Sequence, residues 1–158
     1  MPRMHGEKSS AQNHIFFFNS VIMAEIPNSI NGVQVMFSSK VNKNVDQALV
    51  DCLRHCIRHD IAPGHSFRSV YISSANDQHS LPSRHAQMKA VDISRINGTK
   101  MIIGYLPYTD VKAIVDAIQS RFETFIGRRE NFGPSRKAKH GQDFSIGGHK
   151  DHIHLSVD

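Results

Sequence analysis

The dipeptide Asn97-Gly98 restricts the possible folds more than any other feature of the sequence, because it is the strongest hairpin signal in the chain. It separates two runs that we expect to be strands, 89–94 and 99–103. Strands joined by a two-residue turn run antiparallel, so at least part of the sheet is antiparallel. Further strands are expected at 33–37, 69–73, 131–133 and 151–157.

Two stretches have the apolar periodicity of amphipathic helices. The first covers 45–59, with Asn44 as its N-cap, and the second covers 111–125, which Thr109 or Asp110 opens. The basic, glycine-rich stretch that precedes the last strand is expected to be a loop. Together with the hairpin, this order predicts an α+β domain: a small, mostly antiparallel sheet with helices packed on one face.

The 158 residues are enough for one domain with a single core. We expect 1–30 to be an N-terminal extension, partly disordered, and 31–158 to form the domain. The apolar run 15–18 is interrupted by Asn19 and Ser20, and it is too short to span a membrane. The polar break and an acidic residue in the basic start also argue against a secretion signal.

The formal net charge of +5 favours anionic partners. The basic run 136–140 has only Phe132 as a nearby aromatic residue, so we do not expect it to bind nucleic acid.

Cys52 and Cys56 are spaced like residues on one side of a helix. Together with His55 and His59, which lie along the same helical side, they are candidates for a second metal site. Cysteine at core spacing is more typical of a small buried apolar residue, so we expect both thiols to be reduced and buried.

Two segments far apart in the chain carry the chemistry of a metal site. His85 is followed by Asp92, and His152 and His154 share one face of the expected terminal strand. If that strand pairs with the Asp92 strand, then His85, Asp92 and one terminal histidine can bind a zinc ion that keeps one position open. Such a site also needs a base for proton transfer. The candidates near His154 in the sequence are Asp151, His152 and His149.

The pattern Ser-x-His-x6-Asp, followed near the end by His-x-His, resembles the peptidoglycan zinc peptidases. This group includes D-Ala-D-Ala carboxypeptidases and phage L-alanyl-D-glutamate endolysins, with lysostaphin-type enzymes and hedgehog domains as more distant relatives. The matching residues are Ser83-Arg84-His85, Asp92 and His152-Ile153-His154. The resemblance extends loosely over 33–158. It implies a hedgehog-like or D-Ala-D-Ala-peptidase-like fold and one Zn²⁺ per chain, held by His85, Asp92 and His154.

The resemblance also implies hydrolysis of a peptide bond in peptidoglycan by metal-activated water. The base is expected just before the last ligand, either at Asp151 or at His152. We favour Asp151 as base and His152 as the oxyanion or orienting partner, although strand alternation favours His152. Ser83, Arg84 and His149 are expected to contact substrate.

Two departures from the family pattern bear on the substrate. The family often has a glycine four residues before the aspartate, where this chain has Met88. The stretch 72–76 lacks the arginine that helps to hold substrate in the family, a role that Arg68 or Arg84 is left to fill.

The resemblance implies peptidoglycan peptide stems as partners, and we expect a monomer without a membrane span. We expect synthesis in the cytoplasm and action on the cell wall, in the periplasm or, because the secretion signal is not convincing, after release by lysis. Two other functions fit the same residues. One is a non-catalytic, zinc-stabilised domain of this fold that binds cell wall or another protein. The other is a basic nucleic-acid-binding protein or a metal nuclease that uses the histidines.

Overall fold

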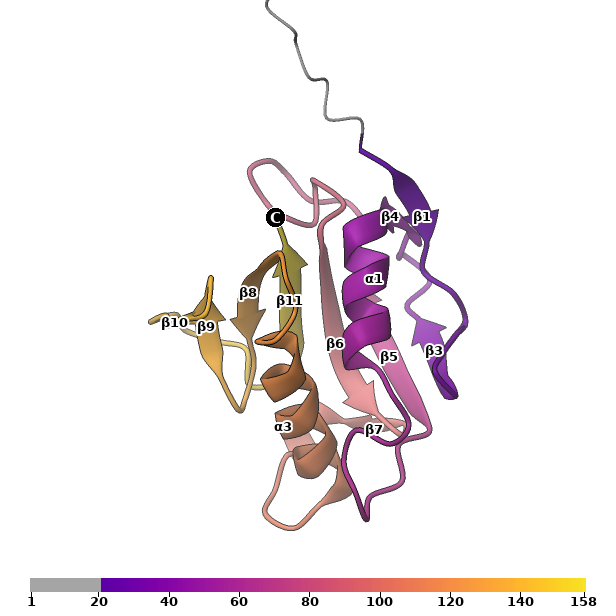
Figure 1. Ribbon diagram of the computed structural model, residues 1–158, viewed down its shortest axis with the longest axis vertical. Helices are drawn as coiled ribbons and strands as arrows, with labels where there is room; N and C mark the ends of the chain where they lie inside the picture. The colour runs from indigo at the N-terminus through magenta and orange to yellow at the C-terminus, as the bar shows by residue number, and fades with distance from the viewer. Residues whose placement is uncertain (1–20) are drawn as a thin grey trace, which may run out of the picture.

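A nine-stranded sheet organises residues 21–158, the part of the chain that the computed structural model describes (Figure 1). Neighbouring strands pair antiparallel except β3 and β5, which pair in parallel. In spatial order the strands are β10 (Gln142–Asp143), β9 (Lys137–Lys139), β8 (Arg128–Phe132), β11 (Ile153–Val157), β6 (Ala90–Ile96), β5 (Ser69–Ser74), β3 (Val33–Phe37) and β2 (Ser29–Ile30), with β7 (Thr99–Lys100) paired to β6. A separate two-stranded sheet joins β1 (Met23–Glu25) to β4 (Asn44–Asp46).

Helices α1 (Gln47–Cys56) and α3 (Asp110–Phe122) lie against one face of the large sheet (Figure 1). Their buried apolar side chains join the inward-facing strand residues in one core. The expected α+β class, with a mostly antiparallel sheet and helices on one face, is confirmed. None of the helices in residues 21–158 is long and apolar enough to cross a membrane.

The first helix begins later than the sequence indicated. Asn44 lies in β4, and Asp46 is the N-cap, with its Oδ1 accepting the N–H of Ala48 at 2.9 Å. The expected start at Val45 is wrong because this segment pairs with β1, a distant strand. The second helix begins after Thr109, one of the two residues expected to open it.

The hairpin at Asn97-Gly98 is confirmed, and both residues have positive φ, 51° and 80°. The Asn97 side chain fixes the turn. Its Oδ1 accepts the N–H groups of Arg68 (2.8 Å) and Ser69 (3.1 Å), and its Nδ2 donates to the Ser66 carbonyl (2.6 Å). The hairpin is therefore tied to the entry of β5.

The expected strand 99–103 needs correction. Only Thr99 and Lys100 are extended, and the next four residues form the short helix α2 (Met101–Gly104). Met101 and Gly104 are buried, whereas Ile102 and Ile103 between them are exposed, which is helical rather than strand spacing.

The stretch 135–148, expected to be a loop, contains β9 and β10. The turn that leads into β9 is held by buried Gln119 on α3. Gln119 donates to Asn131 Oδ1 at 2.8 Å and to the Arg136 carbonyl at 3.0 Å, and it accepts the N–H of Ser135 at 3.0 Å. These bonds connect the β8–β9 hairpin to the helix layer.

The N-terminal side of the domain reaches back before residue 31. Ile26 is fully buried, and Ile30 belongs to β2 and is also buried. Residues 21–30 are thus part of the fold, while the expected disorder within residues 1–20 lies outside the described residues. Cys52 and Cys56 are buried free thiols, as expected.

Candidate metal centre

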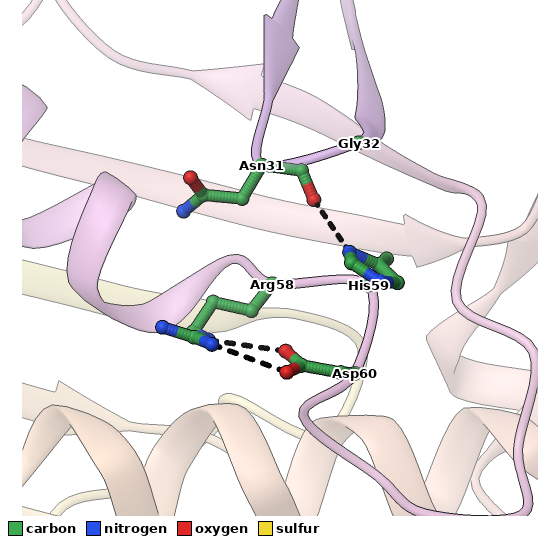
Figure 2. Close-up of a pocket in the computed structure, with 5 residues that line it drawn as sticks. All are labelled: Asn31, Gly32, Arg58, His59 and Asp60. Atoms are coloured by element: carbon green, nitrogen blue, oxygen red, sulfur yellow. Dashed lines mark hydrogen bonds and ion pairs between the residues drawn. The ribbon is translucent and has the colours of Figure 1, made fainter.

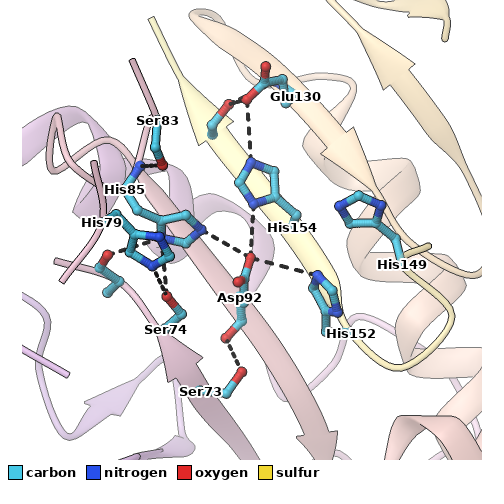
Figure 3. A network of polar contacts seen from close by, with 12 residues as sticks. Ser73, Ser74, His79, Ser83, His85, Asp92, Glu130, His149, His152 and His154 are labelled. Atoms are coloured by element: carbon cyan, nitrogen blue, oxygen red, sulfur yellow. Dashed lines mark hydrogen bonds and ion pairs between the residues drawn. The ribbon is translucent and has the colours of Figure 1, made fainter. Parts of the chain in front are cut away.

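The pairing of β6 with β11 places His154 directly opposite Asp92. Ile153 and Leu155 point into the core, so His154 lies on the sheet face away from the helices (Figure 3). Its Nδ1 lies 2.8 Å from Asp92 Oδ1. The condition set by the sequence, a terminal strand beside the Asp92 strand, is met.

His85 reaches the same point from the loop between β5 and β6, and its side chain is buried (Figure 3). Its Nε2 lies 3.3 Å from Asp92 Oδ1. Ser83 Oγ accepts the backbone N–H of His85 at 3.2 Å, so Ser83 positions the loop. One ligand atom each from His85, Asp92 and His154 lies within 4.8 Å of the others.

Both histidines are oriented through their other ring nitrogen. His85 Nδ1 donates to the Ala75 carbonyl at 3.0 Å, which leaves Nε2 facing Asp92. His154 Nε2 donates to Glu130 Oε2 at 3.3 Å, and the same oxygen accepts a hydrogen bond from Ser156 Oγ at 2.8 Å. Such outer partners are typical of metal-binding histidines. Two oriented imidazole nitrogens and one carboxylate fit zinc.

Glu130 is a functional candidate that the sequence analysis did not indicate. It lies in β8, next to β11, and one residue before the strand expected at 131–133. In the sequence Glu130 follows two arginines, and this arrangement does not form a recognisable motif. Only the strand order brings it to His154.

The charges at this centre are strongly coupled. Burial opposes ionisation of Asp92, but hydrogen bonds from His154 and His85 outweigh it and hold the pKa of Asp92 well below its usual range. Burial also opposes the charge on His154, but Asp92 and Glu130 outweigh it and raise the pKa of His154 to about 9. The hydrogen bond from His154 lowers the pKa of Glu130.

Asp151 and His152 form a pair at the edge of the centre. His152 Nδ1 donates to Asp151 Oδ1 at 2.7 Å. Figure 3 shows His152 beside Asp92, with His152 Nε2 4.0 Å from Asp92 Oδ1. The Asp151 side chain is 63% exposed. The imidazole thus lies between the carboxylate of Asp151 and the three candidate ligands.

His149 stands beside this pair. Its ring centroid lies 4.9 Å from that of His152 and 5.2 Å from that of Phe132. Burial lowers the pKa of His149, which favours the neutral imidazole. Its place at the rim agrees with the expected substrate contact, which stays a prediction.

The two candidate arginines lie elsewhere. Arg84 donates to the carbonyl of Val157 and to Gln87 Oε1, so its guanidinium binds the chain itself. Arg68 lines a different hollow, together with Asn97 and Asp110. The geometry favours neither of them as the substrate-holding arginine.

Asp77 and His79 lie behind His85. The His79 ring stacks on the His85 ring with centroids 4.5 Å apart, and Asp77 accepts a hydrogen bond from Ser74 at 2.8 Å. The three residues Asp77, His79 and His85 are close enough to hold an ion. His85 Nδ1, however, already donates to Ala75, so we interpret Asp77 and His79 as support for the His85 ring.

The alternative cysteine–histidine site on α1 does not assemble. His55 Nε2 lies 2.8 Å from Thr124 Oγ1, and His59 Nδ1 lies 3.1 Å from the Asn31 carbonyl (Figure 2). In residues 21–158 no candidate metal group includes either cysteine.

Comparisons with known protein families, with curated proteins and with solved structures found no match for this chain.

Proposed function

We propose that this protein is a zinc-dependent peptidase that hydrolyses a peptide bond in bacterial peptidoglycan. The observation that carries the proposal is the convergence of His85, Asp92 and His154 beside the Asp151–His152 pair. The substrate class and the peptidase-like fold rest on the motif resemblance. A zinc ion held by these three residues supplies Lewis-acid chemistry, making water more acidic and polarising a carbonyl group.

His152 is the proposed base. Its Nε2 faces Asp92, while Asp151 holds Nδ1, so the imidazole can take a proton from water and pass it to the leaving amine. Asp151 orients the ring and stabilises its charge. These roles reverse the assignment favoured from the resemblance, in which Asp151 is the base and His152 its partner.

The test is incubation of zinc-loaded protein with purified peptidoglycan, with mass spectrometry of the released fragments. We expect a new amine and a new carboxylate at one kind of peptide bond. The masses identify the bond and distinguish endopeptidase from carboxypeptidase action.

Three variants assign the roles. His154→Ala should lose both zinc and cleavage, because it removes a ligand. His152→Ala should keep zinc and lose cleavage by about 10²–10⁴-fold, the usual contribution of an acid–base group. Asp151→Asn should keep zinc and retain more activity than His152→Ala.

Two outcomes would contradict the proposal. Zinc-loaded protein that binds wall peptides without cutting them would favour the non-catalytic domain. Degradation of DNA or RNA, with no effect on wall peptides, would favour the metal nuclease.

A further inference from the structure

Two cations face each other on the β6–β7 hairpin. Arg95 is directly opposite Lys100, so both side chains leave the same face of the sheet. Like charges in this position are destabilising. None of the ion pairs within residues 21–158 involves either side chain. Within the described residues, the two cations thus lie side by side without an ion-pair partner of their own.

The pair lies on the sheet face that carries the metal centre. Ile93 and Ile96 both point into the core, and the irregular pairing of β5 with β6 leaves Ser94 and Arg95 outside it. The Arg95 guanidinium lies over the Tyr71 ring, 4.8 Å from its centroid. This stacking holds one of the two cations in place.

Arg95 and Lys100 line a hollow of about 260 Å³, together with Ser94, Ile102 and Asp151. Asp151 connects this hollow to the metal centre, because its Oδ1 holds His152 Nδ1 at 2.7 Å. The hollow thus adjoins the centre on the His152 side. Its size suits a short side chain or a chain end.

We propose that this hollow binds a carboxylate of the substrate peptide, an inference that rests on the proposed peptidase function. Arg95 offers a planar fork of N–H donors and Lys100 an ammonium group, and both bind carboxylates well. With Asp151 also in the wall, the three charges sum to one positive charge, which matches a single carboxylate rather than a dianionic phosphate.

Two kinds of carboxylate meet this description, an acidic side chain and the free end of a peptide. Binding of matched peptides to the zinc-loaded protein separates them. The first pair is acetyl-L-Ala-D-Glu-amide and its neutral twin acetyl-L-Ala-D-Gln-amide. The second pair is acetyl-D-Ala-D-Ala and its C-terminal amide. Isothermal titration gives each dissociation constant.

At least one charged peptide should bind about five- to tenfold more tightly than its neutral twin, as expected for a charge-assisted contact at a half-open site. That preference should disappear in Arg95→Gln/Lys100→Gln. The matched control Arg54→Gln/Arg58→Gln also removes two positive charges, but from α1 and the residues after it, and it should keep the preference. Lys100→Gln alone should weaken the preference while leaving the Arg95–Tyr71 stacking in place.

The proposal is overturned if both charged peptides bind no better than their twins, or if the preference survives in Arg95→Gln/Lys100→Gln. The experiment measures binding and not cleavage. A failure to cleave peptidoglycan would therefore refute the proposed function without deciding whether the hollow binds a carboxylate. Conversely, normal cleavage without any preference for the charged peptides would refute the carboxylate subsite and leave the proposed function standing.

Discussion

Glu130 should control how tightly the centre holds zinc, although it is not one of the three candidate ligands. It accepts hydrogen bonds from His154 Nε2 and from Ser156 Oγ, and its side chain is only 15% exposed. Loss of such an outer partner typically weakens metal binding about 10–100-fold. Glu130→Gln keeps an acceptor oxygen and removes only the charge. We therefore expect zinc affinity to fall by the lower end of this range, about tenfold, or 1.4 kcal/mol.

The size of this effect should depend on pH. In the metal-free protein the pKa of His154 is raised to about 9, so at pH 7 zinc must displace a proton. Removing the charge of Glu130 lowers that pKa and eases the proton competition, which offsets part of the lost affinity. The loss of zinc affinity in Glu130→Gln, relative to the wild type, should therefore be smaller at pH 7 and increase toward pH 9.

The assay is competition with a chelating zinc indicator at pH 7 and pH 9. Glu123→Gln is a matched control, because Glu123 is also 15% exposed and binds Arg128 and Asn131 rather than the centre. An unchanged zinc affinity in Glu130→Gln, or an equal loss in both variants, would refute the reasoning.

Three further predictions concern stability. Zinc at 1,000 times its dissociation constant should raise the unfolding temperature by about 8–16 °C in a scanning calorimeter, and His154→Ala should abolish the shift. Asn97→Ala loses three hydrogen bonds and a residue that tolerates positive φ, so urea unfolding should show a loss of about 2–4 kcal/mol, while Asn97→Gly should lose less. Burial opposes the charge of Asp116, but Lys112 and Tyr105 outweigh it and lower its pKa. The ionised Asp116 therefore stabilises the fold at pH values above its pKa in the unfolded chain, about 3.9, and this stabilisation is lost as the pH falls through its lower pKa in the folded protein. At pH 7 the unfolding temperature of Asp116→Asn should be lower than that of the wild type. The difference between the two unfolding temperatures should disappear in acid.

Local patterns predicted the parts of the fold that depend on neighbours in sequence. The turn at Asn97-Gly98 and the amphipathic faces of α1 and α3 are of this kind. The start of α1 was misplaced because Asp46 and Asn44 are both good caps, and only the pairing of β4 with β1 decides between them. Charged composition concealed β9, because two lysines, Lys137 and Lys139, flank its one buried residue, Ala138.

The resemblance to the peptidoglycan zinc peptidases singled out the three candidate ligands, and the pairing of β6 with β11 brings two of them together. Ala75 and Glu130, which orient the two imidazoles, were not predictable, because their role follows from strand order and loop path alone. Met88 also gains meaning from the structure. Its φ of 62° lies in the left-handed region, which glycine adopts without strain and which a side chain such as methionine rarely occupies.

The hydrophobic core fixes the register that builds the metal centre. Ile153, Leu155 and Val157 are all buried, and His154 lies between the first two on the opposite face. A slip of β11 by one residue would turn His154 into the core and these three apolar side chains toward water. Exposing them would cost roughly 5–9 kcal/mol, which approaches the whole stability of a typical domain, about 5–15 kcal/mol. The opposition of His154 and Asp92 is therefore enforced by apolar packing before any ion binds, and zinc would meet a site that is already assembled.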